Sequence, residues 1–540
     1  MGGNETRGAC APSTARPAGR PPHSAQPLDG VPMAASWRHG HGSFCLLLLL
    51  LVAVDAAAAA VGAGAAGSFS HVQLSAESLL RAAGSSCPAP QEEQHGAATG
   101  TRMPVVHQHG PCSPLAGKRE KAPSHAEILA ADQRRVEYIH RRVSETTGRA
   151  RPPKRGAAPA VYLQPGAPST AATPASASPS YAKSAANLPA SSGRALGTGN
   201  YVVTIGLGTP SERFTVVFDT GSDTTWVQCQ PCVAYCYRQK EPLFRPAKSS
   251  TYANISCSSS YCDDLDVSGC DGGHCLYGVE YGDGSQTIGF YAQDTLKLAY
   301  DVIKEFRFGC GENNRGLFGR SAGLMGLGRG KTSLTVQAYG KYGGVFAYCL
   351  PATPSGTTGF LDLGPGAPAA NARLTPMLTD NGPTFYYVAL TGIKVGGHLL
   401  PIPESVFSGA GALVDSGTVI TRLPPSAYEP LRSAFAGAMD ALGYRKAPAL
   451  SILDTCYDLT GQQGPSVALP AVSLVFRGGA CLDVDASGIL YVADASQACL
   501  AFAANDADDD VAIVGNTQQK TYGVLYDLAR KVVGFAPGAC

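Results

Sequence analysis

The sequence predicts a mainly β protein whose body consists of two duplicated lobes. From about Asn200 onward the chain is made of short runs rich in β-branched and aromatic residues, such as YVVTIGLG and FYYVALTGIKV, bounded by Gly, Pro, Asp and Ser. A clear helical period occurs in few places of this body, best at Ser426–Leu442. The stretch FDTGS at Phe218–Ser222 returns as VDSGT at Val414–Thr418, which indicates that one lobe repeats the other.

A second pair of repeats supports the duplication. GLMGLG at Gly323–Gly328 and AIVGNT at Ala512–Thr517 each follow one of the Asp stretches by about a hundred residues. The alternative is chance repetition in a chain with 64 glycines, but four matching segments in one order argue against it. We therefore place the N-terminal lobe at residues 197–375 and the C-terminal lobe at residues 376–540.

Charge is distributed unevenly along the chain. Residues 1–196 carry 19 Lys and Arg against 11 Asp and Glu, whereas residues 197–540 carry 23 against 30, although the formal net charge is only +1. A basic leader before an acidic body predicts an electrostatic clamp within one chain. The alternative is that both sets of charges face solvent.

Cysteine usage indicates an oxidising compartment. Thirteen of the 17 cysteines lie between Cys229 and Cys540, and this density favours disulfides. A zinc site is the competing interpretation of CQPCVAYC, but the following cysteines do not repeat its spacing and no His pair accompanies them. The disulfide candidates, with connectivity left open, are Cys229, Cys232, Cys236, Cys257, Cys262, Cys270, Cys275, Cys310, Cys349, Cys456, Cys499 and Cys540.

Residues 1–67 are predicted to be an upstream extension followed by a signal peptide. FCLLLLLLVAV at Phe44–Val54 is shorter than a membrane span and precedes small residues, as does the apolar region of a signal peptide. About forty residues precede this run, so we expect Met33 to be the true start. The Arg-bearing, acid-poor residues 1–32 leave a transit peptide as the alternative.

Residues 68–196 are predicted to be a propeptide and a linker. SHAEILAADQRRVEYIHRRVSE predicts a basic helix with Ser124 as its N-cap and Glu127 three positions later. Residues 151–196 are rich in Pro, Ala and Ser and predict a flexible tether open to proteolysis. The apolar residues at helical spacing are Ile128, Leu129, Val136, Ile139 and Val143, and the arginines that we expect to face solvent are Arg134, Arg135, Arg141 and Arg142.

Asp219 and Asp415 form one acid–base pair if the two lobes bring them together. Two carboxylates held close in a partly desolvated cleft cannot both ionise cheaply, so the pair shares one proton over an acidic range. The ionised carboxylate takes a proton from water as that water attacks a peptide carbonyl, while the protonated one hydrogen-bonds the carbonyl oxygen. Small neighbours allow close approach and short hydroxyls orient the carboxylates; these are Gly221, Gly417, Thr220, Ser222, Ser416 and Thr418.

Together these motifs resemble a pepsin-type aspartic protease over about Asn200–Cys540. The resemblance is carried by FDTGSDTTWVQC, YGDGS, VDSGT and the two apolar-apolar-Gly segments. The cysteine cluster Cys229–Cys275 and FGCGENNRGLF are similar to the plant nepenthesin-like branch of that family. The segments VVHQHGPCSPL and GTGNYVVTIGLGTP are most similar to the subgroup that contains a chloroplast-nucleoid DNA-binding aspartic protease.

The resemblance implies a bilobal pepsin-like fold with the active-site cleft between its lobes. It makes Asp219 and Asp415 the catalytic pair, and Thr220 and Ser416 the hydroxyl residues that brace the two loops against each other. Cys481 stands where the family has no cysteine, so we expect it to be the unpaired thirteenth cysteine of the body.

The resemblance also implies a flap hairpin that closes over substrate. Tyr281, Gly282 and Asp283 match its tip, and Trp226 matches the indole that hydrogen-bonds the tyrosine. The sequence GDGS after Tyr281 is a hairpin-turn signal, which favours a flap over an ordinary strand residue. The alternative for Trp226 is a plain core position.

The activity that follows is that of an aspartic endopeptidase with an acid optimum, made as a zymogen whose propeptide is its intramolecular inhibitor. Two alternatives share the fold: an inhibitor-like binding protein and a nucleic-acid-binding protein. Both Asp–hydroxyl–Gly triplets are intact, which counts against the inhibitor. The acidic body has no basic run, so any nucleic-acid contact belongs to the leader.

The remaining expectations concern partners and location. Substrates are proteins or peptides, no cofactor or metal is required, the chain is a monomer, and no membrane attachment persists after signal removal. We expect the secretory pathway, with the apoplast or the vacuole as destination, and the plastid as the alternative. Asn254 begins a glycosylation sequon, which is relevant only to a secreted chain.

Overall fold

The computed structural model describes most of the body and parts of the segment before it. The described residues are 69–75, 101–108, 113–115, 123–147, 201–281, 284–316, 318–352, 359–365, 371–409, 411–460 and 466–540. The predicted signal peptide, the start at Met33 and the tether at residues 151–196 lie outside these ranges.

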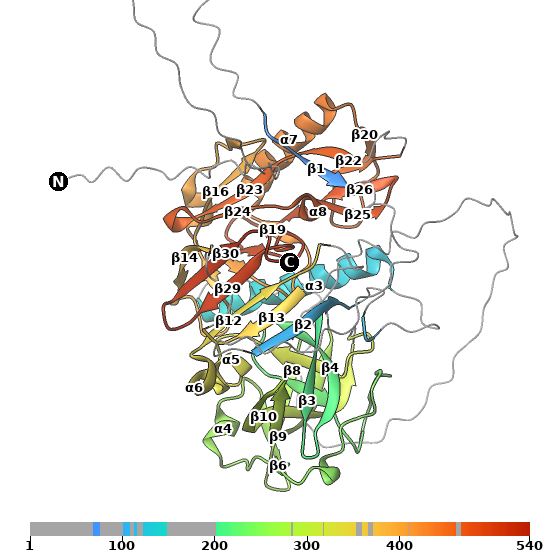
Figure 1. The fold of residues 1–540 in the computed structure, drawn as a ribbon, viewed down its shortest axis with the longest axis vertical. Coiled ribbons are helices and arrows are strands. Elements are labelled where there is room, and N and C mark those ends of the chain that lie inside the picture. The colour runs from blue at the N-terminus through green and yellow to red at the C-terminus, as the bar shows by residue number, and fades with distance from the viewer. Residues whose placement is uncertain are drawn as a thin grey trace, which may run out of the picture. The chain divides into compact units, whose positions relative to one another are not determined.

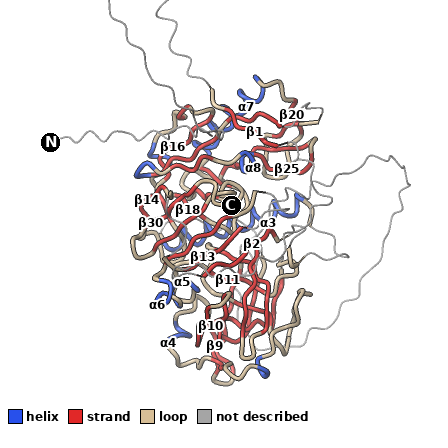
Figure 2. Tube along the Cα trace, in the orientation of Figure 1, coloured by secondary structure: helices blue, strands red, loops and turns tan. Residues whose placement is uncertain are grey.

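Strands make up most of the secondary structure after residue 200, so the prediction of a mainly β, bilobal fold is confirmed (Figure 2). In the N-terminal lobe β3 and β4 are antiparallel neighbours, and the long strands β9 and β10 pair along most of their length. The strands of this lobe are β3 (Tyr201–Leu207), β4 (Glu212–Asp219), β5 (Trp226–Gln228), β6 (Ala253–Asn254), β7 (Ser268–Asp271), β8 (His274–Glu280), β9 (Gln286–Leu298), β10 (Asp301–Arg315) and β11 (Gly323–Gly326).

The C-terminal lobe contains two four-stranded sheets, ordered β17-β16-β23-β24 and β20-β21-β26-β25. A further sheet holds β15, β18, β28, β19 and β27. The strands are β15 (Tyr387–Val388), β16 (Leu390–Val395), β17 (His398–Leu399), β18 (Ala412–Val414), β19 (Thr421–Leu423), β20 (Arg445–Ala447), β21 (Cys456–Asp458), β22 (Ser466–Pro470), β23 (Val472–Phe476), β24 (Cys481–Asp483), β25 (Leu490–Asp494), β26 (Gln497–Leu500), β27 (Phe502–Ala504) and β28 (Ala512–Val514).

Helices are few among the described residues of the body, and the longest one lies where the sequence predicts it. Helix α7 (Pro425–Ala441) buries Tyr428, Leu431 and Phe435 on one face, as the apolar period at Ser426–Leu442 requires. The short helices are α4 (Ser260–Asp263), α5 (Leu334–Gln337), α6 (Tyr339–Tyr342) and α8 (Ala486–Ile489), with 3-10 turns at η2 (Pro246–Lys248), η3 (Glu404–Phe407) and η4 (Arg477–Gly479).

One antiparallel sheet contains strands from both halves of the chain. Its order is β13-β12-β29-β30-β14, so strands from the two halves share one hydrogen-bonded base. The bounds are β12 (Val345–Cys349), β13 (Gly359–Leu363), β14 (Arg373–Leu378), β29 (Gly523–Asp527) and β30 (Val532–Ala536). This shared base fixes the position of one lobe relative to the other.

Two strands of the predicted propeptide pair with the body. Strand β2 (Thr101–His107) lies antiparallel to β13 at the edge of the shared sheet, and its last residues pair with β3. Strand β1 (His71–Ser75) lies antiparallel to β22. Arg102 of β2 also forms an ion pair with Asp362 of β13 at 2.6 Å. Both strands are therefore bound to the body through sheet hydrogen bonds.

The predicted basic helix is α3 (His125–Thr146), drawn in cyan between the two lobes in Figure 1. Ser124 accepts a hydrogen bond from the Glu127 N–H and Glu127 accepts one from the Ser124 N–H, so the expected capping box is present. One helical face packs on the C-terminal lobe and so hides its apolar stripe from water. The buried residues of that face are Leu129, Asp132, Val136, Ile139, His140 and Val143.

The duplicated motifs occupy equivalent places in the two lobes, which confirms the internal repeat. Strand β4 ends at Asp219 and runs parallel to β11, with Gly326 as the register partner of Asp219. Strand β18 ends immediately before Asp415 and runs parallel to β28. Each apolar-apolar-Gly segment therefore supports the strand that carries one of the two aspartates.

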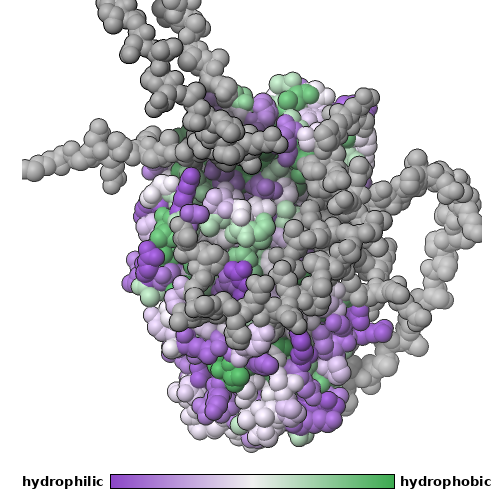
Figure 3. All heavy atoms as spheres, viewed as in Figure 1, coloured by the Kyte–Doolittle hydropathy of each residue, from purple (hydrophilic) through white to green (hydrophobic). Residues whose placement is uncertain are grey.

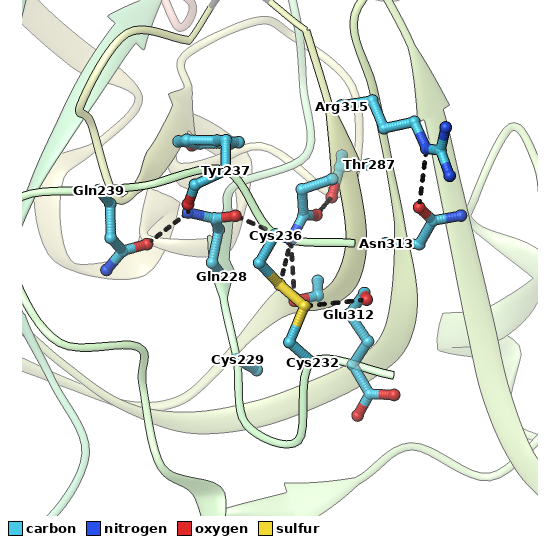
Figure 4. Close-up of a disulfide and its surroundings, with 12 residues drawn as sticks. Gln228, Cys229, Cys232, Cys236, Tyr237, Gln239, Thr287, Glu312, Asn313 and Arg315 are labelled. Carbon is cyan, nitrogen blue, oxygen red and sulfur yellow. Dashed lines mark hydrogen bonds between the residues drawn. A yellow bond between two sulfur atoms is a disulfide. The ribbon is translucent and has the colours of Figure 1, made fainter. Parts of the chain in front are cut away.

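Six disulfides use all twelve candidate cysteines: Cys229–Cys310, Cys232–Cys236, Cys257–Cys270, Cys262–Cys275, Cys349–Cys540 and Cys456–Cys499. Around Cys232–Cys236, Gln228 donates hydrogen bonds to the Gln239 side chain and the Tyr237 carbonyl, which tethers the short disulfide loop to β5 (Figure 4).

The expectation that Cys481 is unpaired is wrong, because Cys481 is also disulfide-bonded. The odd count considered only the thirteen cysteines of the body, whereas the whole chain has 17.

No helix within the described ranges is long and apolar enough to cross a membrane. On the face drawn in Figure 3, hydrophilic side chains are interspersed with small hydrophobic groups.

The disulfides differ greatly in the chain length that they close, and this predicts unequal contributions to stability. Cys349–Cys540 spans 191 residues and Cys232–Cys236 spans 4. We expect Cys349→Ser/Cys540→Ser to lower the free energy of unfolding by about 3 kcal/mol more than Cys232→Ser/Cys236→Ser, because a longer crosslinked loop restricts the unfolded chain more. Urea unfolding followed by circular dichroism measures both losses, and equal losses would contradict the prediction.

Candidate active site

Asp219 and Asp415 lie at the carboxyl ends of the two equivalent strands, and both are buried. The Leu327 N–H donates to the Asp219 carbonyl at 2.8 Å, and the Asp415 N–H donates to the Val514 carbonyl at 3.1 Å. The backbone of each aspartate is thus bound to the supporting strand of its own lobe. The sequence prediction that one carboxylate comes from each half agrees with this placement.

Each carboxylate has the same set of local donors. The Gly221 N–H donates to Asp219 at 3.0 Å and the Ser222 hydroxyl donates at 2.7 Å. At Asp415 the Gly417 N–H donates at 3.0 Å and the Thr418 hydroxyl at 2.6 Å. Two donors from positions two and three residues downstream fix each carboxylate and favour its ionised form.

Thr220 and Ser416 join the two loops. The Thr220 N–H donates to the Ser416 hydroxyl at 3.1 Å, and the Ser416 N–H donates to the Thr220 hydroxyl at 2.9 Å. The two hydroxyl oxygens lie 3.3 Å apart. This reciprocal pair holds the aspartates next to each other across the boundary between the lobes.

Glycine is required at the residue two positions after each aspartate. A Cβ on Gly221 would lie 2.7 Å from a carboxylate oxygen of Asp415, and a Cβ on Gly417 would overlap Asp219. Any side chain at either position would therefore displace the opposite carboxylate.

Arg135 of α3 occupies the space between the two carboxylates. Its guanidinium lies 2.8 Å from Asp219 Oδ1 and 2.9 Å from Asp415 Oδ2, and further N–H groups donate to the same two side chains at 3.2 Å. The Arg135 side chain is only 16% exposed. The expectation that this arginine faces solvent is wrong, because it is the cation that pairs with both aspartates.

The two carboxylates titrate differently. Burial raises the pKa of Asp219, and the neighbouring Asp415 adds to this rise against the opposing charge of Arg135. Burial acts on Asp415 in the same direction, but Arg135, the Thr418 hydroxyl and the Gly417 N–H together lower its pKa below the ordinary value. The pair is therefore asymmetric although its local donors are symmetric.

Arg135 keeps its charge throughout. Burial alone would lower the pKa of its guanidinium, but the charges of Asp219 and Asp415 raise it above the ordinary value. The arginine is consequently a permanent cation opposite two groups that can be neutralised by acid.

The flap residues are placed only in part. The Trp226 indole N–H donates to the Tyr281 hydroxyl at 2.7 Å, and the rings of both residues contact the edge or face of Phe318. Gly282 and Asp283 lie outside the described residues. The structure thus brings Trp226 and Tyr281 together as the resemblance implies.

Within the described ranges, no group of three or more His, Cys, Asp or Glu residues is arranged to hold a metal ion.

Asn254 of the sequon is exposed at the end of β6, and its side chain accepts a hydrogen bond from the Tyr252 hydroxyl.

Sequence reasoning missed Arg135 as a member of this site, although a signal was present. Asp132 and Arg135 fall among the apolar positions of the helix, between Leu129 and Ile139 at spacings of three and four residues. A charged residue on the buried face of a helix needs a charged or hydrogen-bonding partner. That pattern distinguishes these two residues from charges on the solvent face.

Comparisons with known proteins agree with the fold. The family model described as xylanase inhibitor N-terminal matches residues 201–365, and the model described as xylanase inhibitor C-terminal matches residues 385–537. Among solved structures, edgp has a TM-score of 0.53 at 20% identity, covering 63% of this chain and 91% of its own. The basic 7S globulin of soybean has a TM-score of 0.50 at 22% identity, covering 63% and 93%.

Closer sequence relatives are plant aspartic proteases. An aspartyl protease family protein of Arabidopsis thaliana is 44% identical, covering 86% of this chain and 92% of its own. Aspartyl protease AED1 of the same plant is 43% identical, covering 82% and 87%. Nepenthesin-2 of Nepenthes gracilis is 36% identical, covering 64% and 78%. The first two matches are longer than residues 201–540 alone, so the similarity includes part of the leader.

The bond between Trp226 and Tyr281 gives a prediction for stability. Tyr281→Phe leaves the buried indole N–H without its acceptor, and we expect the free energy of unfolding to fall by about 1–3 kcal/mol. Tyr261→Phe is the matched control, because the Tyr261 side chain is exposed. Urea unfolding of both variants measures the difference, and equal stability of the two would contradict the assignment.

Proposed function

Because this chain belongs to the family of plant aspartyl proteases, we propose that it is an aspartic endopeptidase, made as an inactive precursor, that hydrolyses peptide bonds with Asp219 and Asp415. The observation that carries this proposal is the pair of buried carboxylates held by equivalent donors at the boundary between two lobes. An assembly of this kind gives an acid and a base on either side of one water molecule.

The reaction needs the two carboxylates in different protonation states. With one proton shared between them, one carboxylate removes a proton from water as the water attacks the peptide carbonyl carbon. The other donates a hydrogen bond to the carbonyl oxygen as negative charge develops there. The bracing of Thr220 and Ser416 keeps the carboxylates in place while charge moves between them.

Arg135 prevents this reaction in the precursor. Its guanidinium lies within hydrogen-bond distance of both carboxylates, so it stands where the water and the scissile carbonyl would bind. It also favours the doubly ionised form of the pair, which has no proton to donate to the substrate. We therefore assign α3 as the inhibitory element of the propeptide.

Acid weakens this inhibition. Arg135 helps to hold the pKa of Asp415 below its ordinary value while α3 is docked. This pair therefore favours docking above the ordinary pKa of an aspartate, about 3.9, and its contribution is lost as the pH falls and Asp415 is protonated. His125 acts in the same direction: burial lowers its pKa, so its protonation below about pH 6.5 opposes docking.

The alternative function is a binding protein on the same fold. It is favoured by the descriptions of the two family models and by the likeness to a seed globulin structure. The retained aspartates, with all of their donors in place, favour the peptidase instead.

A location in the secretory pathway, with the apoplast or vacuole as destination, is our proposal too, and the six disulfides support it.

The first test measures cleavage of a denatured protein by the full-length chain between pH 2.5 and pH 7. We expect cleavage in acid that falls by about 100-fold to 10,000-fold in Asp219→Asn and in Asp415→Asn, because each variant loses one member of the acid–base pair. Asp509→Asn, at an exposed position, is the control and should behave as the wild type. A folded wild type that binds a xylanase but cleaves nothing would favour the binding protein.

The second test concerns Arg135. Arg135→Ala removes charge-assisted hydrogen bonds worth roughly 1.5–3 kcal/mol each, so we expect the precursor to hydrolyse a short fluorogenic peptide at pH 6 about tenfold or more faster than wild-type precursor. Arg141→Ala is the matched control, because this arginine is exposed on the same helix. Identical pH profiles for Arg135→Ala and Arg141→Ala would refute the inhibitory role.

A further inference from the structure

A carboxylate from α3 is buried in the C-terminal lobe beside the two aspartates. Asp132 accepts hydrogen bonds from the Val419 N–H at 2.6 Å and from the Ile420 N–H at 3.2 Å, and the Arg422 guanidinium donates to it at 2.8 Å. The side chains of Asp132 and Arg422 are 0% and 1% exposed. Three donors of the body thus converge on one carboxylate of the propeptide.

Two of these donors belong to the loop that carries Asp415, and the third lies in the strand that follows it. Val419 and Ile420 directly follow Thr418, whose hydroxyl binds Asp415, and Arg422 lies in the adjoining strand β19. On the helix, Asp132 precedes Arg135 by three residues, which is a rise of about 4.5 Å. The carboxylate-binding group is therefore next to the position of the scissile bond.

Arg422 obtains its partners from α3. Its guanidinium donates to Asp132 and, at 2.9 Å, to the Gln133 side chain, and both of these residues lie on the helix. Among the described residues, Arg422 forms an ion pair with no carboxylate of the body, and its Nε has no acceptor. A buried guanidinium without an anion is unfavourable, so the body carries a charge that needs a partner once α3 has left.

An apolar cluster adjoins Asp132 on the side toward the N-terminus of α3. Leu129, one turn before Asp132, packs with Val419, Ile420, Leu453 and Tyr491 in an apolar cluster of the C-terminal lobe. Along α3, apolar Leu129 is therefore followed by acidic Asp132 and then by cationic Arg135, which pairs with Asp219 and Asp415. A substrate that replaces the helix meets the same apolar pocket and the same carboxylate donors.

We propose that, in the activated enzyme, the Val419 and Ile420 N–H groups and Arg422 form a subsite for an acidic side chain of the substrate. Asp132 occupies this subsite in the precursor as a mimic of that side chain. The inference rests on the proposed peptidase function and specifies its substrates. An extended peptide advances about 3.3 Å per residue, so the preferred Asp or Glu lies within about three residues of the scissile bond.

The test uses the acid-activated full-length protein and a series of fluorogenic peptides that differ by Asp or Asn at one position. The assay is run at pH 5, where an ordinary Asp side chain, with a pKa of about 3.9, is ionised. At one position within three residues of the cleaved bond, we expect kcat/KM for the Asp peptide to exceed that for the Asn peptide by about 10-fold to 100-fold, as for other charge-assisted hydrogen bonds.

Two variants assign that preference to Arg422. Arg422→Gln should cleave both peptides with the kcat/KM that the wild type shows for the Asn peptide, whereas the control Arg530→Gln, at an exposed position of the same lobe, should keep the wild-type preference. The peptide series on the wild type decides the matter even if Arg422→Gln does not fold. Equal cleavage of Asp and Asn peptides at every position, or an undiminished preference in folded Arg422→Gln, overturns the subsite. Cleavage of no peptide overturns the peptidase function instead.

Discussion

The structure depends on holding two like charges, Asp219 and Asp415, side by side in a buried place. Repulsion between the two carboxylates is offset in two ways, by hydrogen-bond donors on the two loops and by the charge of Arg135. Gly and hydroxyl donors on each loop stabilise each carboxylate, and the crossed bonds of Thr220 and Ser416 keep the loops from separating. Arg135 then supplies a cation that pairs with both carboxylates and favours their ionised forms against burial and mutual repulsion. In the proposed precursor, inhibition and stability would therefore come from the same ion pairs.

Helix α3 is bound to the body by more than this one arginine. Its apolar stripe packs on the C-terminal lobe, and Asp132 accepts a hydrogen bond from the Val419 N–H of the Asp415 loop. Arg142 forms an ion pair with Asp266 of the N-terminal lobe at 2.6 Å. The basic leader and the acidic body thus meet through specific ion pairs. In one of these pairs, Asp132–Arg422, the leader supplies the anion and the body supplies the cation. Net charge alone does not indicate such a reversal.

Much of the fold could be predicted from the sequence because its signals are local. Short runs rich in β-branched and aromatic residues predicted strands, the repeat of Asp–hydroxyl–Gly predicted two equivalent lobes, and Ser124 with Glu127 predicted the start of α3. The partners of Arg135 could not be predicted, since they lie 84 and 280 residues away and depend on where the helix docks. Cys481 was misjudged for a related reason: disulfide pairing is decided by the folded precursor, whereas the count was limited to the body.

Cutting the tether between leader and body does not by itself empty the proposed active site. After such a cut, β1 and β2 still pair with β22 and β13, and α3 still packs on the C-terminal lobe with Arg135 against the two aspartates, because none of these contacts involves residues 151–196. Sheet hydrogen bonds are insensitive to acid, whereas the pairs of Arg135 with Asp219 and Asp415 are not. On the proposed function, release of α3 would follow protonation of Asp219 and Asp415. The same fall in pH would then both expose the site and give the two carboxylates the protonation state that the proposed reaction needs.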